Sequence, residues 1–386
     1  MNFDDMIERR GTSCLKWDRV EDRYDVPPDA LPMWVADMDF RAPEFVLDAA
    51  RTRLDHGVFG YGHDMDGYLG AIAWWMKTRH GWEVDPASVF TTTGLCNAIA
   101  LLLEAYTAPG DGIVTFTPVY HAFDRTIRGT GRRTVEIPLE RDGDRYVMNL
   151  DASALTGDEK VLLFCSPHNP VGRVWSRDEL QAVATFADTH DLLLISDEIH
   201  HDLVFPGHTH VPMTAIDGIA ERLIMLTAPS KTFNLAGMST GNVVIADPKL
   251  RAPFANLMRA LHIESTELGI TMASAAYSPE GAAWVDALVA YLDTNRRAFD
   301  AGVNALPGLS SIPLEATYLS WVDFSGTGMT QDEIVHRVER EAGIAANHGT
   351  TFGRGGEGFM RFNLGTQRAH VDDALRRLTS AFGDLQ

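Results

Sequence analysis

The sequence has few cysteines and no long hydrophobic run. Cys14, Cys96 and Cys165 are an odd, scattered set among 386 residues, and no two of them form a CxxC pair. This pattern argues against a disulfide framework and favours a reducing compartment, so we expect a cytoplasmic protein. No apolar stretch approaches the roughly 20 residues that span a bilayer, and the charged start MNFDDMIERRG is unlike a signal or transit peptide. We therefore expect no membrane association.

Positive charge is also scarce. The chain has 33 Lys and Arg against 53 Asp and Glu, which gives a net charge of −20 at pH 7. A surface of this sign repels phosphate backbones, so we expect no nucleic-acid partner. The length and the 45% share of hydrophobic residues suffice for one large domain and a smaller one.

Four histidines, His200, His201, His208 and His210, cluster in the stretch IHHDLVFPGHTH. Histidine is a common metal ligand, so the cluster raises the question of a metal site. The spacing matches no zinc pattern, and no cysteine or second ligand pair accompanies it. We expect a polar loop and no metal site.

Apolar runs alternate with helical patterns through the centre of the chain, which indicates parallel strands joined by helical crossovers. GNVVIA follows the last of these strands so closely that we expect it to be an antiparallel partner. Past about residue 285 helical and strand patterns follow one another without the regular alternation of the centre. We predict an α/β fold with a large domain over 46–285 and a small α+β domain from 1–45 and 286–386. Strands are predicted over 88–94, 112–118, 160–167, 192–198, 222–228 and 241–246, and helices over 95–106 and 176–190.

Residues 227–239, TAPSKTFNLAGMS, place Lys231 between two strands with no carboxylate within five residues on either side. Most lysines are solvated surface residues, and a strand end is often exposed. However, ligands of open parallel sheets gather beyond the carboxyl ends of the strands, where this lysine lies.

Polar or aromatic residues follow three other strands. Asp197 ends LLLISD and either caps a turn or faces a cationic ring nitrogen. Asn169, in SPHNPVG, is either a turn residue or a donor to an oxygen of a bound ring. Tyr120, in TPVYHAF, has an aromatic face that can stack on the same ring.

Gly94 lies where a strand meets a helix, so the amides of Leu95 and Cys96 are free to bind an anion at the helix N-terminus. Together with the strand-end residues, this pattern describes a phosphorylated, cationic, planar ligand beside a lysine. Pyridoxal phosphate needs such a site, because its aldehyde reacts with lysine, its pyridinium pairs with an acid and its phosphate requires oriented donors.

The chain resembles fold-type I, class I/II aminotransferase-like enzymes along nearly its whole length. The motifs TTTGLCNAI, PVYHAF, SPHNPVG, ISDEIH, APSKTFNLAG and MRFNLG occur in the family's order. The resemblance implies a mostly parallel seven-stranded sheet between helices, and pyridoxal 5'-phosphate as cofactor. It implies Lys231 as the Schiff-base lysine, Asp197 as the pyridinium partner, Asn169 at the ring hydroxyl and Tyr120 stacked on the ring. Arg361 would hold the substrate's α-carboxylate, whereas the alternative for it is a surface ion pair.

Three further motifs, PMWVADMDF (32–40), FGYGHD (59–64) and DEIHHDL (197–203), are similar to the MalY/PatB group of cystathionine β-lyases. This resemblance implies cleavage of L-cystathionine or a related cysteine S-conjugate to pyruvate, ammonia and a thiol, with Ala36 and Asn169 on the substrate side. An aminotransferase of class I/II is the alternative within the same chemistry. A regulatory protein that acts through its surface is the alternative from another class.

Some positions depart from the wider family. His200 stands where many aminotransferases have a tyrosine on the cofactor, and Ala228 and Ser239 replace a serine and an arginine that often bind the phosphate. The phosphate would then depend on the Leu95 and Cys96 amides and on two hydroxyl groups. These are Ser230 and Tyr61, the latter from a neighbouring subunit, so the resemblance implies a homodimer with shared active sites.

Overall fold

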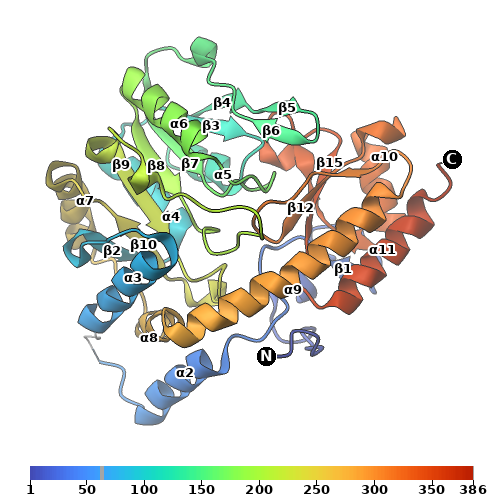
Figure 1. Cartoon of the computed structure of the whole chain (residues 1–386), viewed down its shortest axis with the longest axis horizontal. Coiled ribbons are helices and arrows are strands. Elements are labelled where there is room, and N and C mark those ends of the chain that lie inside the picture. Colours follow the sequence, from blue (N-terminus) through green and yellow to red (C-terminus); the bar gives the residue numbers. More distant parts are fainter. Residues whose placement is uncertain (61–64, 386) are drawn as a thin grey trace.

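The structure is a computed structural model that describes residues 1–60 and 65–385 (Figure 1). Its largest sheet has seven strands and confirms the predicted α/β class. β10 runs antiparallel to both of its neighbours, as its sequence position predicts, and the other pairs are parallel. Across the sheet the strands are β2 (Val89–Thr92), β10 (Gly241–Val244), β9 (Leu223–Thr227), β8 (Leu193–Asp197), β7 (Glu159–Cys165), β3 (Gly112–Thr117) and β4 (Arg133–Pro138).

Helices cover both faces of this sheet because successive strand residues point to opposite sides. Leu162 and Leu194 belong to one hydrophobic core, and Leu163 and Ile195 to the other. The first core includes α3 (Met65–His80), α6 (Arg177–Thr189) and α8 (Glu267–Ala276), and the second includes α4 (Leu95–Tyr106), α5 (Ala122–Gly129) and α7 (Pro248–Leu261).

Local signals in the sequence set several helix ends. Ser176 caps α6 and forms a capping box with Glu179. Thr330 caps α10 (Gln331–His336), which continues into a π-helical turn over Arg337–Glu341. Further elements are the short helix α1 (Leu15–Asp18), the hairpin of β5 (Glu140–Asp142) and β6 (Arg145–Val147), and the longer helix α2 (Glu44–His56), which follows the N-terminal segment.

A second, antiparallel sheet lies in the C-terminal part. Its strand order is β11 (Ser310–Ser311), β12 (Leu319–Asp323), β15 (Phe359–Asn363) and β14 (Asn347–His348), and α11 (Arg368–Phe382) packs in the same core. The N-terminal segment joins this part through β1 (Leu31–Pro32), which pairs in parallel with β13 (Ile344–Ala345).

The long helix α9 (Pro279–Asn304) runs across the molecule and links the two cores (Figure 1). Trp284 and Leu288 pack in the core of the large sheet, whereas Phe299 and Val303 pack in the core of the small one. The boundary predicted at 285/286 thus falls inside one continuous helix, and the domain limits stay a prediction.

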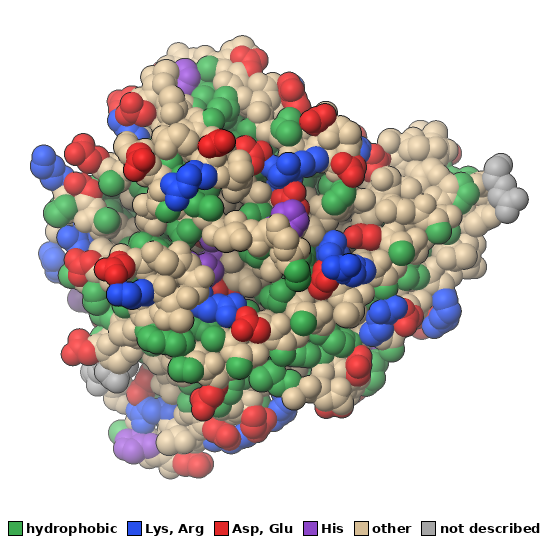
Figure 2. Space-filling model, in the orientation of Figure 1, with side chains coloured by type: hydrophobic (Ala, Val, Ile, Leu, Met, Phe, Trp, Pro, Cys, Tyr) green, Lys and Arg blue, Asp and Glu red, His purple; other side chains and the backbone are tan. Residues whose placement is uncertain are grey.

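On the face drawn in Figure 2, acidic and basic side chains are interspersed. Among residues 1–60 and 65–385, no helix combines the length and apolar character that a membrane crossing needs.

Candidate active site

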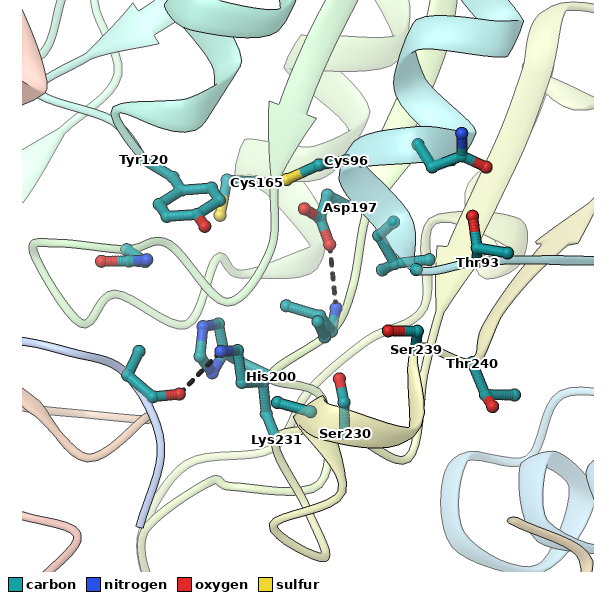
Figure 3. A pocket seen from close by; sticks show the side chains of 17 residues that line it. Thr93, Cys96, Tyr120, Cys165, Asp197, His200, Ser230, Lys231, Ser239 and Thr240 are labelled. Atoms are coloured by element: carbon teal, nitrogen blue, oxygen red, sulfur yellow. Dashed lines mark hydrogen bonds between the residues drawn. The ribbon is translucent and has the colours of Figure 1, made fainter. Parts of the chain in front are cut away.

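A cavity of about 280 Å³ opens beyond the carboxyl ends of the central strands, beside the start of α4 (Figure 3). The structure brings most of the predicted site residues together here, although they come from distant parts of the chain. Those that line it are Ala36, Gly94, Leu95, Cys96, Tyr120, Asn169, Asp197, His200, Ser230 and Lys231.

Lys231 lies in the turn that follows β9. Its Nζ donates a hydrogen bond to the Ala36 carbonyl oxygen over 2.6 Å, and no carboxylate of the described residues forms an ion pair with it. Burial lowers the pKa of this amine. The neutral, nucleophilic form is therefore more accessible than in a solvated lysine.

Asp197 is the last residue of β8 and is buried. One carboxyl oxygen accepts a hydrogen bond of 3.1 Å from the Ile199 amide, and the other has no donor among the described residues. Burial raises the pKa of this carboxyl to about 7. A cation placed against the free oxygen would favour the ionised form, so the site suits a cationic ligand group.

The anion-binding end of the cavity is the N-terminus of α4. Gly94 has a φ of 101°, a conformation that side-chain-bearing residues rarely adopt. The amides of Leu95 and Cys96 have no acceptor among the described residues, as expected for a first helical turn. Aligned amides and the helix dipole together favour a phosphate group.

Hydroxyl groups surround this helix end. Ser230, Ser239, Thr240 and Thr93 line the cavity on the side away from Tyr120 (Figure 3). Of these four, Thr93 and Thr240 were missed by sequence reasoning, although Thr93 directly precedes Gly94 in the TTTG motif. Ser239 was noted only as the residue that replaces an arginine.

Tyr120 and His200 form other parts of the cavity wall. His200 is buried, and its Nδ1 has no hydrogen-bond partner among the described residues. Burial lowers the pKa of His200 well below its usual value, so the ring is neutral at neutral pH. A neutral imidazole remains able to donate or accept one hydrogen bond in the cavity.

Arg361, on β15, does not line the cavity but contacts it through Asn169. Its guanidinium donates to Asn169 Oδ1 over 2.9 Å and to the carbonyl oxygen of Trp34 and the side-chain oxygen of Asn347. Its Nε is buried without an acceptor among the described residues. Burial lowers the pKa of Arg361 to about 10, so the group stays charged at neutral pH. The alternative of a surface ion pair is therefore wrong.

Two other residues bear on the site. Tyr318, which sequence reasoning missed, donates its hydroxyl over 2.9 Å to the same Ala36 carbonyl oxygen that accepts from Lys231. It lies far along the chain from every site motif, so no local signal marked it. Tyr61, predicted to contact the phosphate, lies outside the described residues.

Comparison with known proteins places this geometry in a family. The model of aminotransferase class I and II matches residues 35–378. The chain belongs to this family. The predicted resemblance is thereby confirmed along nearly the whole chain.

Individual relatives and a solved structure show which members of the family this chain is similar to. Cystathionine beta-lyase PatB of Bacillus subtilis is 40% identical, covering 99% of this chain and 100% of the relative. Protein MalY of Escherichia coli is 32% identical, covering 98% of each chain. Among solved structures, cystalysin from Treponema denticola, which contains a pyridoxal 5'-phosphate cofactor, has a TM-score of 0.94 at 35% identity and covers 100% of this chain and 99% of its own.

Proposed function

We propose that this protein is a pyridoxal phosphate-dependent carbon–sulfur β-lyase that cleaves L-cystathionine or a related cysteine S-conjugate to pyruvate, ammonia and a thiol. One observation carries the proposal: within the described residues, a lysine amine with no carboxylate partner and a buried carboxyl with one oxygen that accepts no hydrogen bond share a cavity at a helix N-terminus. The full-length similarity to a cystathionine β-lyase and to a cofactor-containing cystalysin supports the same reaction.

The residues of the cavity fit the cofactor at each of its ends. Lys231 would hold its aldehyde carbon, Asp197 its ring nitrogen, Asn169 its ring hydroxyl and Tyr120 its ring face. The amides at the start of α4, with nearby hydroxyls such as that of Ser230, would hold its phosphate. When bound, pyridoxal phosphate supplies an electron-accepting ring joined to the substrate's amino nitrogen.

The chain's own groups then have distinct tasks. The Lys231 amine, with its pKa lowered by burial, is suited to take the proton from the substrate Cα. Asp197 keeps the facing ring nitrogen protonated, because an ionised carboxylate stabilises the opposite charge. Arg361 holds the α-carboxylate, a task that suits a planar guanidinium. A thiolate on the substrate Cβ leaves once the Cα proton is gone.

The same residues would serve an aminotransferase, so product analysis has to separate the two reactions. The holoenzyme is incubated with L-cystathionine or another cysteine thioether and, separately, with an amino acid that lacks a β leaving group plus a keto acid. We expect pyruvate, ammonia and thiol in equal amounts from the first mixture, with no keto acid added. Fast turnover in the second mixture alone would replace the lyase by an aminotransferase.

A homodimer with shared active sites completes the proposal. Leu54, Val58 and Phe59 are exposed apolar side chains close before Tyr61, and such a cluster is typical of a surface that a partner covers. Two-fold pairing would complete both sites at once. Sedimentation should show a dimer at assay concentrations, and a fully active monomer would contradict the shared site.

We also propose a cytoplasmic location. Cys14, Cys96 and Cys165 are all free thiols, which suits a reducing compartment. Cell fractionation should recover the lyase activity with cytoplasmic markers, and recovery from the periplasm or medium would contradict the location.

A further inference from the structure

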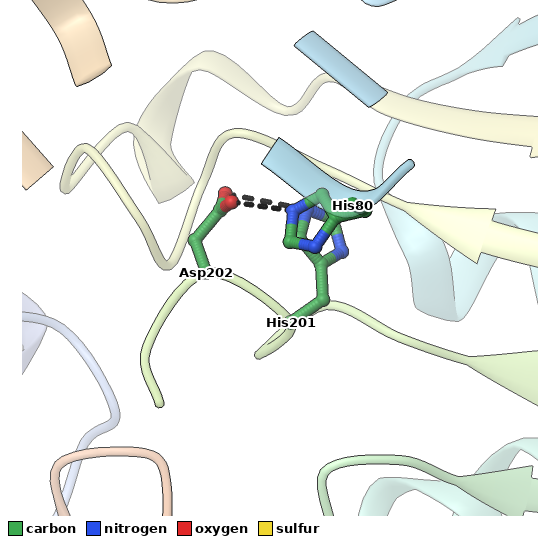
Figure 4. Close-up of side chains that lie close together, drawn as sticks. All are labelled: His80, His201 and Asp202. Carbon is green, nitrogen blue, oxygen red and sulfur yellow. Dashed lines mark hydrogen bonds and ion pairs between the residues drawn. The ribbon is translucent and has the colours of Figure 1, made fainter. Parts of the chain in front are cut away.

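The fold places His80 beside two of the histidine-cluster residues that the sequence singled out. His80 ends α3, whereas His201 and Asp202 lie in the segment after β8 (Figure 4). His80 Nε2 lies 2.8 Å from one carboxylate oxygen of Asp202, and His201 Nε2 lies 3.2 Å from the other. The candidate ligand atoms of the three residues all lie within 4.8 Å of one another. Sequence reasoning found no second ligand pair because His80 is more than a hundred residues away in the chain.

The cluster is enclosed and held in place. Asp202 accepts hydrogen bonds from Trp75 Nε1 over 3.1 Å and from the Thr232 hydroxyl over 2.8 Å. His201 is buried, and its Nε2 forms no hydrogen bond of acceptable geometry with any described residue despite its nearness to Asp202. A buried ring nitrogen aimed at a fixed carboxylate, without a hydrogen bond, is an unsatisfied polar group that an ion would satisfy.

A third imidazole lies next to the cluster. The ring centroid of His210 is 5.9 Å from that of His80 and 6.1 Å from that of His201. His210 is held by Glu198, whose carboxylate oxygen lies 2.8 Å from its Nε2. The surroundings of the three residues are therefore rich in further nitrogen and oxygen ligands.

We propose that His80, His201 and Asp202 bind one divalent transition-metal ion of the Zn²⁺ class. Two imidazoles and a carboxylate are a ligand set that such ions prefer. Zinc bonds of about 2.0–2.2 Å in a tetrahedron put neighbouring ligand atoms about 3.4 Å apart. The observed separations of 2.8 and 3.2 Å need only a small outward movement to reach this value.

The residues around the cluster indicate how the ion would enter and what it would do. His80 also lines a separate cavity of about 420 Å³, whereas His201 and Asp202 do not, so an ion would enter past the His80 ring. Both rings would bind through Nε2 and keep their proton on Nδ1. The ion would join α3 to the segment after β8, and through Asp202 to Thr232, which directly follows Lys231. Its role is therefore structural, since ligands that bind only the folded state stabilise it.

The test uses the full-length holoenzyme, stripped of metals with a chelator and titrated with Zn²⁺ by calorimetry and with Co²⁺ by visible absorption. The variants are His80→Asn and His201→Asn, and the matched control is His208→Asn, because His208 is exposed in the same segment. We expect one ion per chain in the wild type and the control, and affinity at least tenfold weaker in each ligand variant. Zn²⁺ should raise the melting temperature of the wild type but not of His201→Asn.

Several results would overturn the proposal. They are no binding by the wild type, equal binding by both ligand variants, equal weakening by His208→Asn, or a cobalt–thiolate absorption band that assigns the ion to a cysteine. In each case the His80–Asp202 hydrogen bond and the His201–Asp202 ion pair account for the cluster without an ion. The proposed lyase activity does not depend on this site, so either outcome leaves it unchanged.

Discussion

Two lysines contact the same short segment, residues 36–39, in opposite ways. Lys16 is fully buried, and its Nζ lies 2.7 Å from a carboxylate oxygen of Asp39. Lys231 reaches the segment from the cavity side, and among the described residues its Nζ donates a hydrogen bond only to the carbonyl oxygen of Ala36, at 2.6 Å. Lys16 thus faces the charge of a carboxylate, whereas Lys231 faces the dipole of a carbonyl group.

The aspartates of the two regions differ in the same way. Burial acts to raise the pKa of both carboxyls, but Lys16, with help from Arg9, lowers the pKa of Asp39 to about 2. Asp197 has no ion-pair partner among the described residues, and burial raises its pKa to about 7. Charges that compensate one another stabilise the fold, whereas charges left uncompensated in a cavity are available to a ligand.

The largest expected effect separates the two lysines. Lys231→Ala should lower lyase activity about a thousandfold or more, because it removes both the cofactor attachment and the general base. Lys16→Met should instead lower the free energy of unfolding, since it leaves the Asp39 carboxylate buried without its fully buried ion-pair partner. Turnover per folded molecule and chemical denaturation check the two outcomes. Equal loss of turnover in both variants would contradict the assignment of catalysis to Lys231 and of stability to Lys16.

Asp197→Asn should keep the cofactor bound but lower elimination at least about a hundredfold, because an amide cannot hold a pyridinium charge. The matched control is Asp188→Asn, a change at an exposed position on α6. Steady-state kinetics and cofactor absorbance measure the two properties separately. Activity within a few-fold of the wild type would show that the Asp197 charge is not needed.

The sequence predicted the strand ends of the site better than its remaining contacts. Asp197, Asn169 and Tyr120 each follow an apolar run, and parallel strands bring such ends to one edge of a sheet. No local sequence pattern indicates that Tyr318 or His80 is important, because their contacts depend on how distant elements pack. Long-range packing is not encoded in any local pattern.

The same limit applies to the fold. The central strands β3, β7, β8 and β9 are buried apolar runs and were predicted to within a residue or two. The seventh strand, β4, was not predicted individually. In its sequence, RTVEIP, buried apolar residues alternate with polar or partly exposed ones, as is typical of an edge strand. The 2-residue strands β1 and β13 are too short for any periodic signal.

Arg361 combines features of both regions. It is buried and pairs with no carboxylate of the described residues, but neutral side-chain and carbonyl oxygens accept hydrogen bonds from its guanidinium. Arg361→Ala should raise KM at least about tenfold, since the substrate carboxylate loses its partner. Arg361→Lys should recover part of this loss, because it restores the charge but not the planar fork. An unchanged KM in both variants would assign the carboxylate to another group.

The last effect concerns stability and its dependence on pH, and leaves turnover aside. Asp39→Asn should lower the free energy of unfolding by about 3 kcal/mol near neutral pH, because Lys16 and Arg9 lose their nearer carboxylate and keep Asp37, which lies 3.8 Å from the Lys16 Nζ. The folded-state pKa of Asp39 is depressed to about 2, so its contribution is present above pH 4 and is lost as the pH falls toward 2. Denaturation of both proteins across this range should show the difference narrowing at low pH. A constant difference would contradict the ion pair as its source.

Peptide mapping of the borohydride-reduced holoenzyme tests the central claim most directly, because reduction fixes the cofactor to the lysine that carries it. Lys16 and Lys231 compete in this one experiment under identical conditions. The account predicts the cofactor mass on the peptide that contains Lys231, with the peptide that contains Lys16 unmodified. Cofactor on Lys16 or on a surface lysine, with Lys231 unmodified, would contradict it.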